Sequence, residues 1–284
     1  MDKKNTTRLI VLSAIWGSSF IFMRIIAPVL GPILTACLRC LIAGLFLLGV
    51  FKLTNYKINW KKDYKELLII GVLNSAVPFT MFSYAAINIP ASLSTVLNST
   101  TPMIGAILAS TFAIEPLSLK KSIGLVVGSI GVAIISSVNL AGSSPSYFLS
   151  IGACLIATTC YGINGVYVKL KASHIEPKAI AAGSQLFAGL VLVPLTFITP
   201  VSINFTFELF LTVVAFAVIC SAIAYLLFFE LIRNVGPTKT LTVTFLVPIF
   251  GITWATLLLK EPITFPFVMG GLIILMGTYF VTSS

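Results

Sequence analysis

The stretch EPLSLKKSIGLVVGSIG (residues 115–131) returns 146 positions later as EPITFPFVMGGLIILMG (residues 261–277). An offset of 145 aligns WGSSFIFMR (residues 16–24) with YGINGVYVK (residues 161–169). These matches keep the same order along the chain, so we interpret them as an internal repeat rather than as coincidence. The 146-residue offset also pairs Asn88 with Asn234, Pro102 with Pro248, Gly124 with Gly270, Gly131 with Gly277 and Arg39 with Gln185.

Each copy of the repeat is expected to cross a membrane five times. Of the 284 residues, 58% are hydrophobic and 9% are charged, with a mean hydropathy of +1.07, whereas soluble domains carry about 25% charged residues. A membrane-spanning helix needs ~20 apolar residues. The predicted fold class is therefore an all-α integral membrane protein with ten transmembrane helices. They are placed at residues 9–27, 32–51, 66–86, 91–113, 120–138, 147–168, 179–199, 208–231, 238–259 and 264–282.

An odd number of spans in each copy reverses the direction in which the second copy enters the membrane. Residues 1–141 and 142–284 would then form an inverted-topology repeat, two five-helix halves of one transport domain. Secondary transporters use this symmetry, because exchanging the conformations of the two halves turns an inward-open cavity into an outward-open one. The repeat therefore predicts a carrier that works by alternating access.

The Lys and Arg residues behind the formal charge of +10 are distributed unevenly between the two sides of the predicted spans, which indicates the membrane topology. Fifteen of the 18 Lys and Arg residues fall in the loops on one side of the predicted spans, beginning with Lys3, Lys4 and Arg8. The positive-inside rule makes that side cytoplasmic, with both termini on it. The excess of positive charge therefore predicts a multi-pass plasma-membrane protein with lipid as its surroundings and no nucleic-acid partner.

Metal and redox chemistry find little support in the sequence. All five cysteines fall within predicted spans, where they are expected to act as small buried hydrophobic residues. The one histidine, His174, lies in a basic loop. No nucleophile–base pair, metal-ligand set or phosphate-binding glycine loop is recognisable, so we expect no catalytic residue, no metal, no cofactor and no direct use of ATP.

Polar residues in the middle of the predicted spans mark a candidate translocation path. The segment LNSTTP (residues 97–102) is polar at the centre of an apolar span, where such side chains are tolerated if they face a cavity or another helix. Hydroxyl groups there could equally join neighbouring helices, and the aromatic residues could pack in the core. The predicted substrate-binding residues are Trp16, Ser19, Arg39, Asn74, Asn98, Tyr161, Asn164, Gln185 and Tyr225; Pro78, Pro102 and Pro248 are predicted to bend helices during gating.

Among the candidate substrate-binding residues, Arg39 is the one most strongly indicated by the sequence. It lies seven positions after Pro32, about 10 Å into the second span at ~1.5 Å per residue. A charged residue inside a membrane indicates function by default, although a long side chain can also extend back to the surface. The guanidinium group suits a carboxylate or phosphate. Because the repeat places neutral Gln185 opposite it, the site would fit a substrate with one anionic end.

Acidic residues are missing from the same layer. Glu230 is the one carboxylate that could lie within a span, and Arg233 three residues later is its expected ion-pair partner. Without a buried acid to relay protons, facilitated diffusion or exchange is favoured over obligatory proton coupling, and sodium coupling through backbone carbonyls stays open. Glu115 and Glu261, each followed by proline, are expected to cap or terminate helices.

The motifs WGSSFIFMR, LNSTTP and the repeated EP-containing segments resemble the EamA-type branch of the drug/metabolite transporter superfamily over essentially the whole chain. The resemblance implies ten helices, a cavity between the two halves and a bacterial inner-membrane carrier. Both a monomer and a homodimer stay open. It implies export of a small polar metabolite, foremost amino acids or their derivatives. An importer or exchanger of nucleotide-like metabolites and a lipid flippase are the alternatives.

Overall fold

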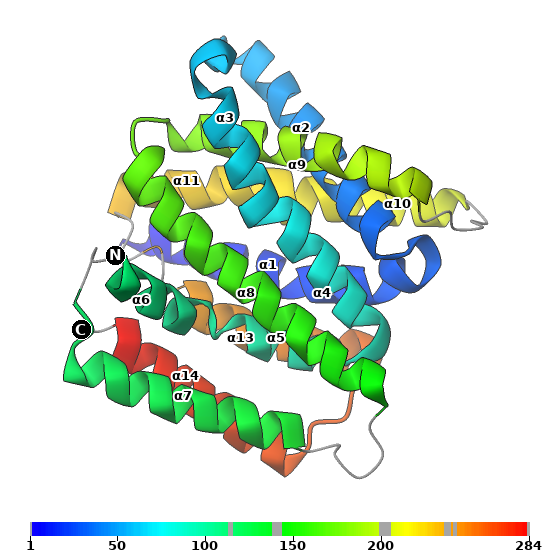
Figure 1. The fold of residues 1–284 in the computed structure, drawn as a ribbon. Coiled ribbons are helices and arrows are strands. Elements are labelled where there is room, and N and C mark those ends of the chain that lie inside the picture. The colour runs from blue at the N-terminus through cyan, green and yellow to red at the C-terminus, as the bar shows by residue number, and fades with distance from the viewer. Residues whose placement is uncertain are drawn as a thin grey trace.

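The computed structural model describes residues 2–112, 116–137, 144–198, 206–235, 240 and 243–282, and every regular element in those ranges is helical. Figure 1 shows the helices stacked into a bundle in which α1 begins and α14 ends at the same end. The elements are α1 (Lys3–Leu30), α2 (Pro32–Leu53), α3 (Trp60–Gly71), η1 (Val72–Ala76), α4 (Val77–Asn88), α5 (Ala91–Asn98), α6 (Thr101–Thr111), α7 (Leu119–Ser137), α8 (Pro145–Lys171), α9 (Pro177–Ile198), α10 (Phe207–Ala217), η3 (Val218–Ile223), α11 (Ala224–Val235), α13 (Val243–Leu259) and α14 (Phe265–Thr282).

Seven continuous helical segments are long and apolar enough to cross a membrane: Lys3–Leu30, Pro32–Leu53, Trp60–Asn88, Pro145–Lys171, Pro177–Ile198, Phe207–Val235 and Phe265–Thr282. They establish a multi-pass helical membrane protein. The other three predicted spans correspond to the pair α5 and α6, to α7, and to α13. Of these, α13 is described from Val243 onward and is 17 residues long.

Two long segments contain a π-helical turn at positions related by the repeat offset. In the third predicted span, η1 covers Val72–Ala76, and in the eighth, η3 covers Val218–Ile223. A π-turn holds one extra residue in an α-helix and is often found at functional sites, because it turns side chains away from the regular helical face. Pro78 lies two residues after η1, inside the continuous segment Trp60–Asn88, so its missing N–H removes one backbone hydrogen bond beside the π-turn.

The fourth predicted span is broken rather than bent. α5 ends at Asn98, and α6 begins at Thr101 with Pro102 in its first turn, a position that suits proline. Hydroxyl groups of the same polar run bond the carbonyls near the break: Thr100 Oγ1 donates to Leu97 O at 2.8 Å, and Thr101 Oγ1 to Asn98 O at 2.7 Å. Pro248, in contrast, lies inside the continuous helix α13.

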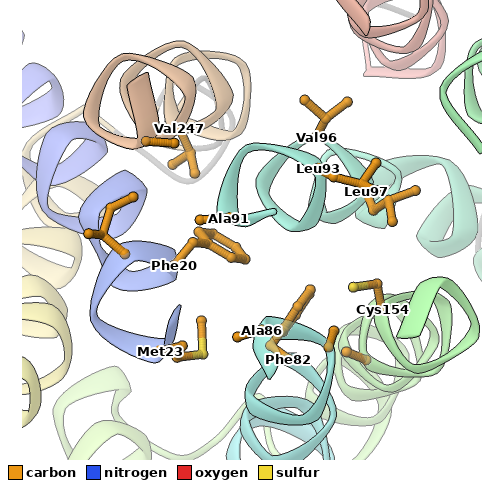
Figure 2. Packing of buried hydrophobic residues seen from close by; sticks show 14 of the residues in the cluster. Phe20, Met23, Phe82, Ala86, Ala91, Leu93, Val96, Leu97, Cys154 and Val247 are labelled. Carbon is orange, nitrogen blue, oxygen red and sulfur yellow. The ribbon is translucent and has the colours of Figure 1, made fainter. Parts of the chain in front are cut away.

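Glycines allow α7 and α14 to pack with their backbones nearly touching, side by side at one edge of the bundle (Figure 1). A Cβ atom added to Gly124 would lie 2.7 Å from Gly277 O, and one added to Gly131 would lie 2.7 Å from Gly270 O. The repeat offset interchanges these two contacts. Apolar side chains fill the centre of the bundle, where residues of α1, α4, α5, α8 and α13 point toward one another (Figure 2).

Candidate functional site

A cavity of about 240 Å³ lies inside the bundle. It is slightly smaller than the ~300 Å³ lower limit for pockets that hold drug-sized ligands, so it suits a small molecule. Helices from both halves of the chain contribute to its wall. The lining residues are Trp16, Ser19, Phe20, Met23, Arg39, Asn74, Phe79, Phe82, Asn98, Thr101, Tyr161, Cys220, Tyr225, Phe228, Val243, Thr244 and Val247.

Arg39 of α2 is held in the cavity wall by two aromatic rings and a hydroxyl group. Its guanidinium carbon lies 3.7 Å from the ring centre of Phe79 and 4.6 Å from that of Phe216. Nε donates to Ser221 Oγ at 2.8 Å, and Nη2 to Cys220 O at 3.5 Å. The residue is 5% exposed, so its side chain does not extend away to a surface.

Gln185 of α9 makes the corresponding contact in the other half. Its Nε2 donates to Ser75 Oγ at 2.9 Å. Gln185 follows Arg39 by 146 residues, and Ser221 follows Ser75 by the same number. Each long polar side chain therefore reaches from its own half of the chain to a serine in a π-turn of the other half, Arg39 to η3 and Gln185 to η1.

Amide groups extend this contact toward the cavity. Asn74 Nδ2 donates to Tyr225 OH at 2.8 Å, and Asn164 Nδ2 donates to Asn74 Oδ1 at 3.2 Å. Asn74 and Tyr225 line the cavity, whereas Asn164 and Gln185 lie behind its wall. Asn164 Oδ1 and Gln185 Oε1 are buried acceptors without a hydrogen-bond partner among the described residues.

Aromatic rings make up much of the cavity lining, in two contacting groups. In the first group, Trp16 packs edge-on to Tyr225 with ring centres 6.3 Å apart, and against Phe228 at 5.3 Å. In the second group, Phe82 contacts Phe20 at 5.4 Å and stacks with Tyr161 at 6.3 Å, their planes 28° apart. The lining therefore offers ring faces and edges as well as polar groups.

The structure brings seven of the nine predicted binding residues to the lining: Trp16, Ser19, Arg39, Asn74, Asn98, Tyr161 and Tyr225. Phe79 and Phe216, which hold the guanidinium group, were not predicted. Nothing in the sequence distinguishes them among 21 phenylalanines. Of the three predicted bending prolines, Pro102 lies in the first turn of α6 and Pro78 follows the π-turn within a continuous helical segment. Pro248 lies inside α13 and lines a second, apolar pocket.

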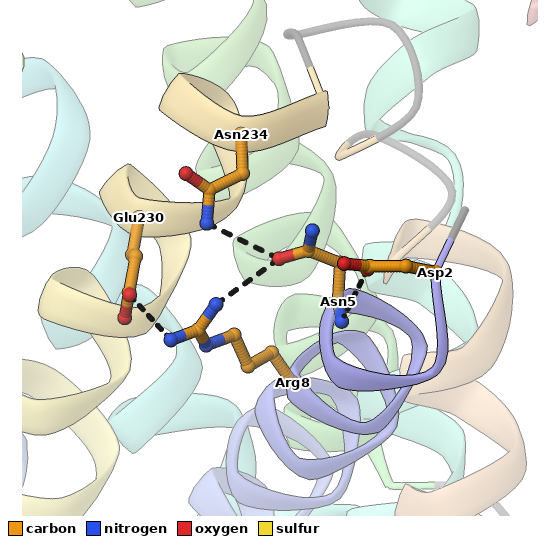
Figure 3. A network of polar contacts seen from close by, with 5 residues as sticks. All are labelled: Asp2, Asn5, Arg8, Glu230 and Asn234. Carbon is orange, nitrogen blue, oxygen red and sulfur yellow. Dashed lines mark hydrogen bonds and ion pairs between the residues drawn. The ribbon is translucent and has the colours of Figure 1, made fainter.

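A separate polar cluster joins the beginning of α1 to the end of α11 (Figure 3). Arg8 forms an ion pair with Glu230, so the sequence-based expectation of an Arg233 partner is wrong. Asn5 Oδ1 accepts from Arg8 Nη1 and from Asn234 Nδ2, both at 3.2 Å. In the other half, Asn88 Nδ2 donates to Ser150 Oγ at 3.2 Å. Asn88 and Ser150 are the repeat equivalents of Asn234 and Asn5.

A cavity with one buried cation, enclosed by helices long enough to cross a membrane, is the arrangement of a membrane transporter. No group of three His, Cys, Asp or Glu side chains in the described ranges could hold a metal ion. The chain belongs to the EamA-like transporter family, whose sequence model matches residues 7–137 and again residues 148–283.

Relatives of this chain carry the names of transporters. The uncharacterized transporter YvbV of Bacillus subtilis is 25% identical over 96% of this chain and 90% of its own length. The uncharacterized inner membrane transporter YedA of Escherichia coli is 28% identical over 87% of this chain and 80% of its own length. A crystal structure with 13% identity superposes with a TM-score of 0.69, covering 99% of this chain and 96% of the other, which shows a shared fold.

Proposed function

We propose that this protein is an inner-membrane carrier that moves a small metabolite, foremost an amino acid or amino-acid derivative, outward by alternating access. The observation that carries the proposal is Arg39, a 5%-exposed cation in the cavity wall. No ion pair joins it to a carboxylate in the part of the chain that the structure describes. Because a buried charge without a counter-ion is costly, a bound anion would stabilise this site.

Ten helices in two inverted repeats, residues 1–141 and 142–284, form the second part of the proposal. Three pairs of equivalent contacts support it: the Arg39 and Gln185 contacts, the two glycine contacts of α7 with α14, and the two asparagine contacts at the ends of α4 and α11. The family model also matches the chain twice. Both termini would be cytoplasmic, as the basic loops predict.

Transport would proceed by facilitated diffusion or exchange. Among the lining residues that the structure describes, none is Asp, Glu or His, the side chains that relay protons across membranes. The gradient of the metabolite would then set the net direction of transport. Its partners would be this small molecule and the surrounding lipid.

Transport by the purified protein in proteoliposomes tests the proposal. From a panel of radiolabelled amino acids, amino-acid derivatives and nucleotide-type metabolites, we expect saturable movement of at least one amino acid or amino-acid derivative without an imposed ion gradient. Arg39→Gln should abolish it, whereas Arg233→Gln, which removes the same charge from an exposed position on α11, should transport normally. Equal transport by wild type and Arg39→Gln would show that Arg39 has no role in substrate binding. Movement of nucleotides alone would select the alternative function.

A further inference from the structure

The cavity carries an unbalanced positive charge. Of its 17 lining residues, Arg39 is the one with a full charge, and no acidic side chain is among them. A carboxylate would neutralise Arg39, whereas the ammonium group of a free amino acid would meet a cation and no anion. At the low effective dielectric of such a site, like charges repel strongly.

The guanidinium group is oriented to receive an anion. Stacking on Phe79 and Phe216 fixes its plane, and Ser221 and the Cys220 carbonyl occupy Nε and Nη2. Nη1 makes no hydrogen bond within the described residues. Nη1 is therefore the donor left for an anion, and because the guanidinium group is already oriented it loses little entropy on binding, so the site favours a carboxylate.

The rest of the cavity fits a flat apolar body. Seven of the lining residues are aromatic: six belong to the two groups, and Phe79 packs against Arg39. Aromatic rings prefer offset or edge-on partners with centres ~4.5–7 Å apart, so a substrate ring in this lining would have several possible partners. Asn98 and Thr101 provide neutral hydrogen-bonding groups in the same lining.

We propose that the cavity selects an organic monoanion with an aromatic body and no ammonium group, such as an N-acylated or deaminated aromatic amino acid. This inference rests on the proposed function and narrows its substrate class. It assigns the selection of an anion over a zwitterion to Arg39, and the selection of an aromatic over a small substrate to the two aromatic groups of the lining.

Four ligands distinguish the effect of the ammonium group from the effect of the aromatic ring: N-acetylphenylalanine, phenylalanine, N-acetylalanine and alanine. Binding is measured by calorimetry on purified protein, and uptake by proteoliposomes. We expect N-acetylphenylalanine to bind at least tenfold more tightly than either phenylalanine or N-acetylalanine, with alanine weakest. Arg39→Gln should bring the ratio of N-acetylphenylalanine to phenylalanine affinity close to one, whereas Arg233→Gln should preserve it. Phe82→Leu should weaken both phenylalanine ligands and leave the ratio between them unchanged.

Each other outcome has a defined meaning. If phenylalanine binds as well as its N-acetyl derivative or better, the charge selection is wrong while the amino-acid carrier stands. If N-acetylalanine equals N-acetylphenylalanine, the aromatic selection is wrong. If folded wild-type protein binds and moves none of the four, both the inference and the proposed amino-acid function fall.

Discussion

Two serines, Ser221 and Ser75, hold the two long polar side chains of the site. Ser221 accepts from a cation that lines the cavity, and Ser75 accepts from neutral Gln185 behind the wall. Hydrogen bonds to charged groups contribute about 1.5–3 kcal/mol, and those between neutral groups about 0.5–1.5 kcal/mol. Removing each serine in turn therefore compares two equivalent hydrogen bonds, one from a charged donor and one from a neutral donor.

Ser221→Ala should free Arg39 Nε and let the guanidinium group turn between its two rings. We expect the substrate concentration for half-maximal transport to rise by about 10- to 100-fold, the equivalent of a lost charged hydrogen bond. Ser75→Ala, the matched change in the other half, should raise it by less than tenfold. The measurement is initial-rate transport in proteoliposomes. A larger effect of Ser75→Ala would contradict a substrate-binding role for Arg39.

Single residues of this site differ in how far the sequence could predict them. Arg39 stands out because an arginine within an apolar span is rare and costly. Asn74, Asn98, Tyr161 and Tyr225 could also be located, since polar groups in the middle of a span must face a cavity or another helix. The contact of Phe79 and Phe216 with the Arg39 guanidinium group could not be predicted, because phenylalanine occurs equally at positions that face lipid, the core or a cavity.

At the scale of helices, the sequence predicted which segments are apolar better than it predicted their interruptions. The run NSTTP is predicted to face the cavity or neighbouring helices. Thr278 of α14 donates to Ser99 O at 2.9 Å, so the run contacts another helix, and Thr100 and Thr101 bond carbonyls at the helix break. Asn98 and Thr101 still line the cavity. The π-turns were not anticipated, because hydrophobic periodicity does not reveal one extra residue in a helix.

Gly277→Ala should disrupt the packing of α14 on α7. The added Cβ would lie 2.5 Å from Gly128 N and 2.6 Å from Gly124 O, so the two backbones would have to separate. Overpacking of this kind costs about 1–3 kcal/mol, and we expect a lower melting temperature in detergent. The control is Gly49→Ala on α2, where nothing lies within 4 Å. Equal melting temperatures for the two variants would show that the contact does not stabilise the protein.

Glu261 caps α5 from outside that helix. Its carboxylate oxygens accept from Ala91 N at 2.8 Å and from Ser92 N at 3.0 Å, and Ser92 Oγ donates to it at 2.6 Å. Lys260, at φ 54°, directly follows α13 and precedes Glu261 in the chain. The repeat equivalent, Glu115, lies outside the described residues. The sequence-based expectation of a helix-capping glutamate is confirmed for Glu261, although the helix that it caps is distant in the sequence.

Glu261→Ala should destabilise α5. N-terminal caps contribute about 0.5–2 kcal/mol to helix stability, and a carboxylate there also interacts favourably with the helix dipole. We expect faster amide hydrogen exchange across residues 91–98, measured by mass spectrometry, with little change in α9. Glu208→Ala, an exposed glutamate in the first turn of α10, is the control. Unchanged exchange in α5 would mean that neighbouring helices alone hold it.

Across the whole molecule, both ends of the bundle have an equivalent asparagine contact, but one end also has an ion pair. The contacts of Asn234 with Asn5 and of Asn88 with Ser150 are repeat equivalents, both at 3.2 Å. The ion pair of Arg8 with Glu230 exists at one end alone, because the equivalent positions hold Ala153 and Tyr84. The end that we propose to be cytoplasmic therefore has an additional stabilising contact.

Glu230→Gln should shift the balance toward opening of that end. A partly exposed ion pair contributes about 0.2–1 kcal/mol, so the population of the open form should rise by up to about fivefold. Spin labels at Lys4→Cys and Arg233→Cys report the end that carries the ion pair, and labels at Leu149→Cys and Ile87→Cys occupy the equivalent exposed positions at the other end. We expect longer distances for the first pair and shorter ones for the second, as alternating access requires. Glu208→Gln is the charge control, and lengthening of both pairs together would argue for loosening of the bundle instead of alternating access.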